Sequence, residues 1–305
     1  MKPREPLYLR LHETGEISKR IDDLMHILGD CTLCPRHCHV NRLQGENGVC
    51  RVGDLPMVSS FGPHFGEERP LVGRNGSGTI FLTYCNLKCI FCQNYDISHL
   101  GHGEECSLVE LGEMMLSLWR QGCHNINFVS PSHQIAQIVA ALPYAVERGL
   151  DIPLVYNCGG YEEISTLRLL DGIFDIYMPD FKYGDSETAR CLSGATRYVE
   201  KAEEALREMH RQVGDLVLDE RGIAVKGLLV RHLVLPGGLA GTRRVMRFLA
   251  KEISPSTYVN IMDQYRPCFR AAEHPMLNRR ISASEFDGAL SIAWEEGITR
   301  LDRMG

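Results

Sequence analysis

The chain has 305 residues, of which 44% are hydrophobic and 24% are charged. This composition is typical of a globular protein with a buried core, and it excludes a disordered or collagen-like chain. The net charge of -6 argues against binding to nucleic acid or to an anionic membrane surface. Neither a signal peptide nor a run of about 18 apolar residues is present, so we expect a cytoplasmic protein that spans no membrane.

Residues 1–77 are rich in cysteine and glycine and show little periodicity until residue 61, which predicts a small metal-binding appendage. Disulfides are a poor explanation for twelve cysteines without an export signal, because cytosolic thiols stay reduced. Four of these cysteines lie close together in the chain: Cys31, Cys34, Cys38 and Cys50. Four thiolates complete either a zinc tetrahedron or an iron-sulfur cluster, which would be additional to the one considered below, and the spacing is compatible with both. His37 or His39 could replace a thiolate at zinc.

From residue 78 onward, short apolar runs alternate with stretches of helical period, which predicts βα units around a parallel sheet. We expect six strands, at 79–84, 125–129, 153–157, 174–178, 227–235 and 257–262. Capping boxes at Ser107/Glu110 and Ser282/Glu285 predict two helix starts, and residues 198–213 predict a further helix. Six units are too few for a closed eight-stranded barrel. We therefore predict an α/β fold, a partial (βα)6 TIM-like barrel over residues 78–305, with its chemistry at the C-terminal strand ends.

Three further cysteines follow the first predicted strand in a C-x3-C-x2-C arrangement. Cys85, Cys89 and Cys92 can hold three irons of a 4Fe-4S cluster and leave the fourth iron open to another ligand. A structural zinc site would need a fourth protein ligand, and the loop has none at finger-like spacing. Buried or zinc-bound cysteines are the alternative.

This loop, with Phe91 before its last cysteine, resembles the cluster motif of radical S-adenosylmethionine (SAM) enzymes. Nearly the whole chain resembles the pyruvate formate-lyase activating enzyme group, in particular its uncharacterised relatives found with Memo-like and AMMECR-like proteins. The matching stretches are 76–81, 92–94, 178–182, 231–237 and 263–267, and residues 62–68 match a stretch without a readable role. The resemblance implies a partial (βα)6 barrel and SAM bound to the open iron. It also implies cleavage of SAM to a 5'-deoxyadenosyl radical that abstracts hydrogen from a substrate.

Several polar residues at predicted strand ends are candidates for binding SAM. In activating enzymes a Gly-Gly-Glu-Pro turn after the second strand holds the SAM amino group, and here that position reads Ser-Pro-Ser-His. Ser130 and Ser132 are therefore candidate contacts by resemblance, although Ser132 is equally a candidate N-cap for the next helix. Asn157 ends the third strand, where Gly159 and Gly160 would let the backbone approach a ligand; a plain turn is the alternative.

Charged and amide residues at the later strand ends complete the candidate site. By resemblance Asp180 and Lys182 would lie near SAM, whereas a charged pair at a strand end is otherwise typical of a solvated loop. Arg231 interrupts an apolar strand and needs an anionic partner, which is either the SAM carboxylate or a structural salt bridge. Gln264 ends the sixth strand and is a candidate for lining the same cavity.

The favoured function is a radical SAM oxidoreductase that acts on a protein, as an activating enzyme does, or on a small molecule. The expected partners are an electron donor such as flavodoxin or ferredoxin and, in the first case, a protein substrate. The alternative is a non-catalytic zinc or iron-sulfur scaffold that binds a partner protein. The enzyme and the scaffold differ in one respect: only the scaffold needs a fourth protein ligand beside Cys85, Cys89 and Cys92.

Overall fold

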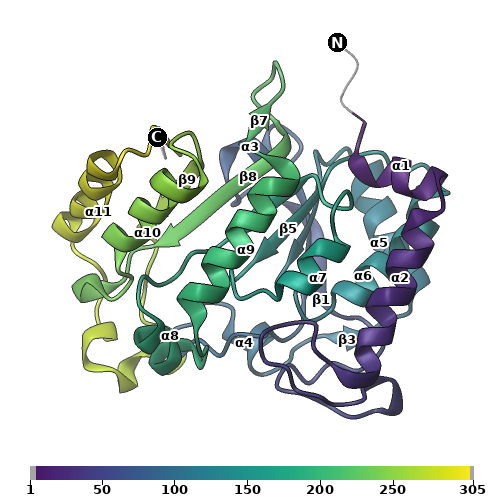
Figure 1. The fold of residues 1–305 in the computed structure, drawn as a ribbon, viewed down its shortest axis with the longest axis horizontal. Coiled ribbons are helices and arrows are strands. Elements are labelled where there is room, and N and C mark those ends of the chain that lie inside the picture. Colours follow the sequence, from purple (N-terminus) through teal and green to yellow (C-terminus); the bar gives the residue numbers. More distant parts are fainter. Residues whose placement is uncertain (1–4, 303–305) are drawn as a thin grey trace.

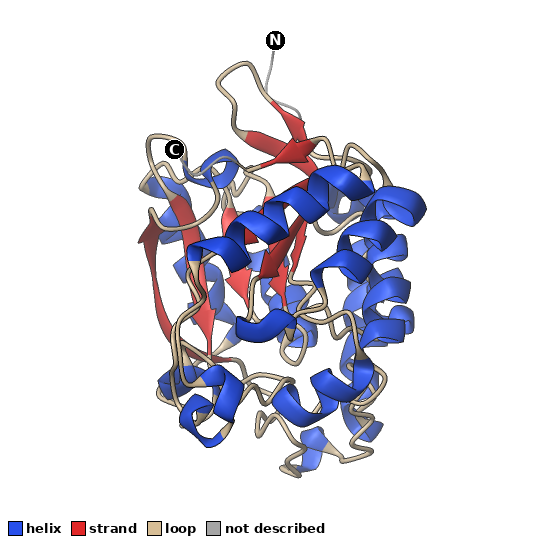
Figure 2. Cartoon of the chain, turned by 90° about the vertical axis from the view of Figure 1, so that its left-hand side faces the viewer, coloured by secondary structure: helices blue, strands red, loops and turns tan. Residues whose placement is uncertain are grey.

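The computed structural model describes residues 5–302 and contains one curved sheet covered by helices (Figures 1 and 2). Its strand order is β10-β9-β8-β6-β5-β4-β2-β1-β3, and β7 pairs with β8. Six parallel strands form its centre: β2 (Ser77–Leu82), β4 (Ile126–Val129), β5 (Leu154–Cys158), β6 (Ile176–Pro179), β8 (Ala224–Leu233) and β9 (Tyr258–Met262). Each overlaps a predicted strand, and the partial barrel is confirmed.

The remaining strands lie at or near the edges of this parallel core. Antiparallel β1 (Met57–His64) pairs with β2, and the short β3 (Glu104–Glu105) pairs with β1. At the other edge, β10 (Arg300–Leu301) pairs with β9, whereas β7 (Val217–Leu218) forms a short antiparallel pair with β8. The barrel is therefore extended at both edges by segments that carry no strong periodicity.

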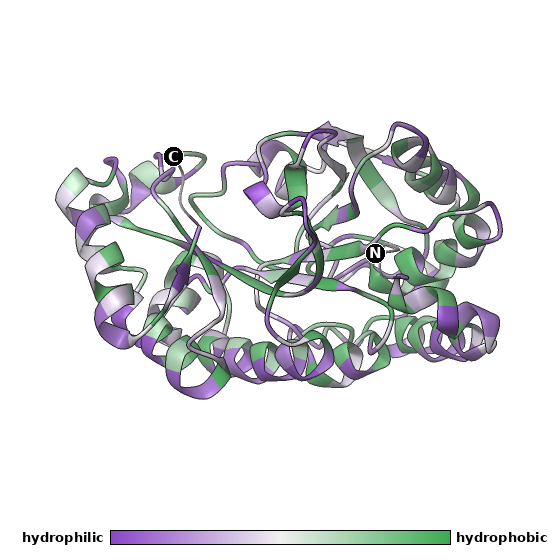
Figure 3. Ribbon diagram, turned by 90° about the horizontal axis from the view of Figure 1, so that it is seen from above, coloured by the Kyte–Doolittle hydropathy of each residue, from purple (hydrophilic) through white to green (hydrophobic). Residues whose placement is uncertain are grey.

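Helices form an arc outside the strands, with their hydrophilic sides outward (Figure 3). Those between the parallel strands are α4 (Tyr95–Ser98), α5 (Leu108–Arg120), α6 (Ile135–Val146), α7 (Ile164–Leu169), α8 (Ser186–Ser193), α9 (Tyr198–Val213) and α10 (Thr242–Phe248), and α11 (Ala283–Glu296) follows β9. Both predicted capping boxes are present, at the starts of α5 and α11. Across residues 5–302, each helix is too short or too polar to cross a membrane.

The expectation of little periodicity before residue 61 is wrong. Helices α1 (Leu7–Glu13) and α2 (Glu16–Ile27) form there, and α2 buries Ile17 and Leu24 while packing against α6. Glycine and cysteine are concentrated in the loop after α2. Because the whole segment was judged by this composition, the amphipathic stretch before the loop was missed. The boundary at residue 77 stays a prediction, although the chain before it supplies β1 to the common sheet.

Apolar residues fill two separate regions of the fold. The larger region lies between the sheet and its helices, and a smaller one lies inside the barrel, where Val155, Ile176 and Leu229 meet Leu71. Leu71 belongs to α3 (Arg69–Val72), which lies at the end of the barrel where β8 begins (Figure 1). Several other inward positions are polar, and they form the site described below.

Two glycines with positive φ allow a test of how tightly β5 and β6 approach each other. Gly160 and Gly15 have φ values of 75° and 73°. A Cβ at Gly160 would lie 2.3 Å from the Asp180 carbonyl oxygen, whereas a Cβ at Gly15, which has a left-handed backbone, would meet nothing within 4 Å. We expect Gly15→Ala to lower the free energy of unfolding by about 1 kcal/mol, the cost of the left-handed backbone. Gly160→Ala should cost about 2 kcal/mol more, because the overlap is with backbone.

Urea unfolding of both variants under anaerobic conditions measures this difference. Equal losses would show that the backbone at Asp180 moves aside freely, which contradicts the tight approach of the two strand ends.

Candidate functional site

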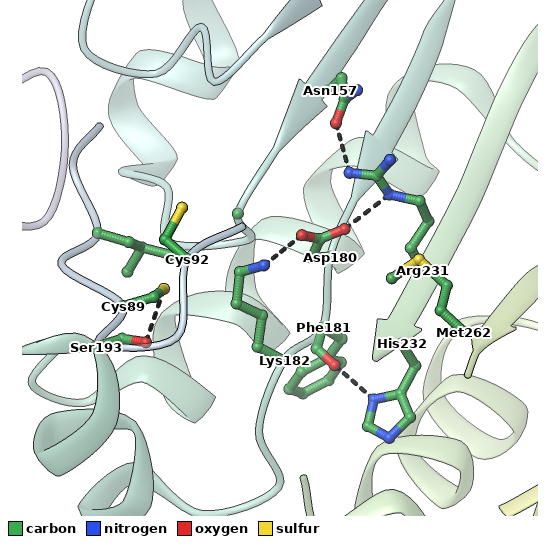
Figure 4. Close-up of polar contacts among 12 residues, drawn as sticks. Cys89, Cys92, Asn157, Asp180, Phe181, Lys182, Ser193, Arg231, His232 and Met262 are labelled. Atoms are coloured by element: carbon green, nitrogen blue, oxygen red, sulfur yellow. Dashed lines mark hydrogen bonds and ion pairs between the residues drawn. The ribbon is translucent and has the colours of Figure 1, made fainter. Parts of the chain in front are cut away.

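The loop between β2 and α4 places three thiols at the C-terminal end of the barrel. Each sulfur has a hydrogen-bonding neighbour: Ser193 Oγ donates to Cys89 Sγ at 2.9 Å, Ser98 Oγ lies 3.1 Å from Cys92 Sγ, and the Leu87 amide donates to Cys85 Sγ at 3.4 Å. Figure 4 shows Cys89 and Cys92 together with Ser193. Hydroxyl and amide hydrogens are suited to stabilise negative charge on sulfur.

The loop is anchored on both sides. Its amides at Lys88 and Ile90 donate to the carbonyls of Ser193 and Leu192, at the end of α8 (2.9 Å each). Phe91 is buried and makes edge-on ring contacts with Tyr183 and Tyr265. The aromatic residue of the motif therefore packs the loop onto the barrel.

Burial opposes the ionisation of two of these thiols. It raises the pKa of Cys85, and it raises the pKa of Cys89 to about 12, against the opposing charge of Lys182. As free thiols, these two groups stay protonated at neutral pH, which makes them poor nucleophiles. A bound metal centre would remove the proton.

The arrangement fits an open iron-sulfur cluster better than a closed zinc site. Within residues 5–302, no group of three or more His, Cys, Asp and Glu side chains converges on a position for a single metal ion. In a 4Fe-4S cluster each thiolate binds a different iron, so the ligands need not converge on one point. Cys85, Cys89 and Cys92 therefore suit such a cluster, and the scaffold alternative, which needs a fourth ligand, gains no support.

Four of the predicted residues meet beside this loop (Figure 4). The Asp180 carboxylate pairs with Lys182 Nζ and, at 2.8 Å, with Arg231 Nε, while Arg231 Nη2 donates to Asn157 Oδ1 at 2.7 Å. The network joins the ends of β5 and β6 to β8. Burial opposes ionisation of Asp180, but Arg231 and Lys182 hold the pKa of its carboxyl below the usual value. The alternative of a solvated charged loop is wrong, because Asp180 is buried.

Lys182 links this network to the cysteine loop. Its ammonium group points to the Asp180 carboxylate, and Cys89 and Cys92 lie to one side of it (Figure 4). The Cys89 sulfur is among the groups that raise the Lys182 pKa against the effect of burial. Arg231 has the salt bridge that was one of its two predicted alternatives. A cation with one carboxylate partner thus faces the sulfur ligands.

Sequence reasoning missed two carboxylates inside the barrel. Glu67 and Glu68 follow β1 and lie 3.5 Å and 3.8 Å from Arg231 Nη1, and Asn260 Nδ2 donates to Glu68 at 3.0 Å. The only signal was the resemblance of residues 62–68, because adjacent glutamates are otherwise typical of a solvated turn. Buried polar atoms here without a hydrogen-bond partner among the described residues include Glu68 Oε2 and Asn260 Oδ1. Such atoms are normally met by water or a ligand.

The other predicted residues have different fates. Ser130 lies beside the network, because its amide donates to the Asn157 carbonyl at 2.8 Å and its φ is 59°. The Gln264 carbonyl accepts from Gln93 Nε2 at 3.0 Å, which places it next to the cysteine loop. Ser132 as a helix cap is wrong. Helix α6 begins at Ile135, three residues after Ser132. The Ser132 hydroxyl donates to the Glu162 carboxylate at 2.6 Å and not to a backbone amide of the helix.

The four N-terminal cysteines also come together. Cys31, Cys34, Cys38 and Cys50 line one small cavity. The loop that carries them follows α2 and lies at the lower edge of Figure 1, on the same side of the molecule as α4 and α8. Both cysteine groups are therefore on the side of the barrel where the parallel strands end.

The chain is similar to known proteins in sequence or in fold. The model of the radical SAM superfamily matches residues 79–220. The uncharacterized protein MJ0674 of Methanocaldococcus jannaschii is 33% identical over 283 residues, which cover 90% of this chain and 77% of that protein. Streptococcus suis SuiB, solved with its precursor peptide SuiA, has a TM-score of 0.50 and 12% identity, over 73% of this chain and 47% of SuiB. The radical SAM methyltransferase TsrM of Kitasatospora setae, solved with tryptophan and a SAM analogue, has a TM-score of 0.51 and 16% identity, over 73% and 52%.

Residues 79–220, just under half of the chain, match the radical SAM superfamily and form a radical SAM domain. Such a domain implies an enzyme that uses SAM and a 4Fe-4S cluster for radical chemistry. The two solved structures support the fold alone at these identities, and the chain spans about half of their length. One of them was solved with a peptide and the other with tryptophan.

A buried carboxyl group behind the site predicts how stability depends on pH. Glu162 is 2% exposed and accepts hydrogen bonds from Ser132 and Tyr156. Burial raises its pKa to about 7, against these hydrogen bonds. A raised carboxyl pKa means that the folded protein holds the proton more tightly than the unfolded chain. The free energy of unfolding should therefore fall as pH rises from 4.5 to 7, by roughly 3 kcal/mol from this group.

Urea unfolding between pH 5 and 8 measures the effect. Glu162→Gln cannot ionise, so its stability should fall less steeply over this range than that of the wild type. Glu67, whose pKa burial also raises to about 7, leaves a residual slope of the same sign. Identical slopes in the wild type and the variant would contradict the raised pKa of Glu162.

Proposed function

We propose that this protein holds a 4Fe-4S cluster through Cys85, Cys89 and Cys92 and binds SAM at the open iron. When both are bound, they supply reductive cleavage of SAM to methionine and a 5'-deoxyadenosyl radical, which abstracts hydrogen from the substrate. The observation that carries the proposal is the group of three thiols, of which Cys89 is buried, beside Lys182 and its carboxylate partner. The match of residues 79–220 to the radical SAM superfamily supports it.

The residues around the loop suggest how SAM is held. Lys182 is the cation that faces the cysteines, and it is suited to a carboxylate. Ser130 and Asn157 at the ends of β4 and β5 offer backbone and amide groups for the amino group. Gln264, next to the loop, completes the set. Ser132 has no direct part in this arrangement, because its hydroxyl is bound to buried Glu162.

Arg231 has a positioning role in this proposal. Its Nε and Nη2 are occupied by Asp180 and Asn157, and its Nη1 faces Glu67 and Glu68. A guanidinium with these partners orients Asp180, which in turn orients Lys182. We therefore assign the anion-binding role to Lys182 and the orientation of its carboxylate partner to Arg231.

The substrate is proposed to be a protein, as for the activating enzymes that the chain resembles. SuiB, which shares the fold, was solved with a peptide. A small molecule is the alternative, and the methyltransferase TsrM was solved with tryptophan. The same proposal includes a flavodoxin or ferredoxin as electron donor, a metal centre at the N-terminal cysteines and a cytoplasmic location.

Removing one cluster ligand tests the central assignment. Cys89→Ala should abolish reductant-dependent formation of 5'-deoxyadenosine in anaerobically reconstituted protein, because the cluster loses one of its three ligands. Cys191→Ala is the matched control, since the Cys191 side chain is exposed and, among the described residues, its sulfur hydrogen-bonds only with Glu187 and Arg190 on α8. Wild-type protein with a full cluster that cannot cleave SAM would sink the proposal.

Lys182→Met tests the assignment of the SAM carboxylate. Loss of the ammonium removes one charge-assisted contact, and we expect the dissociation constant of SAM to rise about tenfold or more. The change in the EPR spectrum of the reduced cluster on addition of SAM measures this binding. Lys19→Met, an exposed substitution on α2, is the control. Equal SAM affinities of the Lys182 variant and the wild type would exclude this role.

A further inference from the structure

The cavity between the four N-terminal cysteines is small and enclosed by polar and apolar groups. Its volume is about 10 Å³, and Arg42, Gly48 and His133 line it together with the sulfurs. Gly48 lies so close that a Cβ there would be 2.8 Å from Cys38 Sγ. The Val49 amide donates to the same sulfur at 3.4 Å. The chain is therefore folded tightly around four sulfur atoms.

A buried cation beside this group favours negative charge on its sulfurs. Arg42 is 1% exposed, and its guanidinium donates to the carbonyls of Gly53 and His133. Its Nη1 lies 3.9 Å from Cys31 Sγ, and no carboxylate among residues 5–302 pairs with it. A buried guanidinium without a counter-ion is costly. Ionised cysteines, as in a metal centre, are the anions available to it.

The geometry favours a cluster over zinc. Around a zinc ion, four sulfurs lie about 2.3 Å from one point, which leaves no free space between them. Here the cavity is about the size that admits a water molecule. No group of three or more His, Cys, Asp and Glu residues within 5–302 converges as a single ion requires. The space between the sulfurs is therefore wider than a single zinc ion requires.

The flanking histidines are not needed to complete the site. His37 Nε2 lies 2.8 Å from Glu163 Oε2, and His39 Nδ1 lies 2.9 Å from Asp30 Oδ1, so a carboxylate engages one nitrogen of each ring. Four thiols already line the cavity, which His37 also borders and His39 does not. Four thiolates are therefore the simplest ligand set.

We propose that Cys31, Cys34, Cys38 and Cys50 hold a second 4Fe-4S cluster, which passes electrons to the cluster at Cys85, Cys89 and Cys92. The electron-transfer part rests on the function proposed above. With four protein ligands the second cluster has no open iron, so it is suited to electron transfer rather than to binding a substrate.

One side chain connects the two cysteine loops. Arg36, two residues after Cys34, donates through Nε to the Asn86 carbonyl at 2.8 Å. Its other nitrogens contact the carbonyls of Gly194 and, at 3.3 Å, Ser193. Asn86 adjoins Cys85, and the Ser193 hydroxyl donates to Cys89 Sγ. The path from one set of ligands to the other therefore runs through short covalent segments and single hydrogen bonds.

The electrons balance in two one-electron steps. A low-potential donor protein of the flavodoxin or ferredoxin class gives one electron to the second cluster, which changes from the 2+ to the 1+ state. That electron then reduces the cluster at the SAM site from 2+ to 1+, and the second cluster returns to 2+. No proton or bond is exchanged in either step.

Metal analysis tests the identity of the second centre. The variant Cys85→Ala/Cys89→Ala/Cys92→Ala, purified anaerobically, should retain about four irons per chain and the Mössbauer spectrum of a 4Fe-4S cluster. Adding Cys38→Ala should remove this iron, whereas adding Cys191→Ala should not. One zinc and no iron in the first variant would overturn the proposal. This readout does not depend on SAM cleavage, so it stands even if the function proposed above fails.

The choice of reductant tests electron transfer. We expect Cys38→Ala, and independently Arg36→Met, to lower the ratio of flavodoxin-driven to dithionite-driven 5'-deoxyadenosine formation by about tenfold, because dithionite reaches the SAM-site cluster directly. Arg10→Met, an exposed change on α1, should keep the wild-type ratio. An unchanged ratio in both variants would overturn this part. Absence of SAM cleavage by the wild type with either reductant would instead count against the proposed function.

Discussion

Burying a charge is costly unless an opposite charge or hydrogen-bond acceptors meet it, and the polar sites of this protein follow that constraint. Inside the barrel, Arg231 is surrounded by Asp180, Glu67 and Glu68. In the N-terminal loop, Arg42 has only carbonyls and a cysteine sulfur beside it. Burial raises the pKa values of thiols in both cysteine groups, those of Cys34, Cys50, Cys85 and Cys89, and a bound metal would replace their protons. The same constraint therefore applies to the ion-pair network and to both cysteine groups.

The parallel barrel brings these charges to one end. Parallel strands end on the same side, so the β2 loop, the ends of β5 and β6, and the middle of β8 meet although they are far apart in the chain. Hydroxyl groups from α4 and α8 then reach the sulfurs of the loop. The second cysteine group is added from outside the barrel and contacts the same loop through Arg36.

Sequence patterns were sufficient for the repeated elements. The six strands and helices α5, α9 and α11 were predicted because apolar periodicity and capping boxes are local properties. Local patterns gave wrong predictions where contacts with distant parts of the chain determine the role of a residue. Ser132 is a favoured cap residue, but the buried Glu162 carboxylate binds its hydroxyl. Glu67 and Glu68 read as a solvated turn, yet the chain after β1 carries them to Arg231 inside the barrel.

The sequence alone identified the three-cysteine loop, its position after the first parallel strand and the expectation of a metal there, because residue type and spacing lie within eight consecutive residues. Only the tertiary structure identified Asp180 and Arg231 as partners and Arg36 as a contact of the loop. These pairs are separated by 50 or more positions in the chain, and no local periodicity records which strand end faces which. Long-range packing decides which buried charges meet, and therefore which residues lie beside the two cysteine groups.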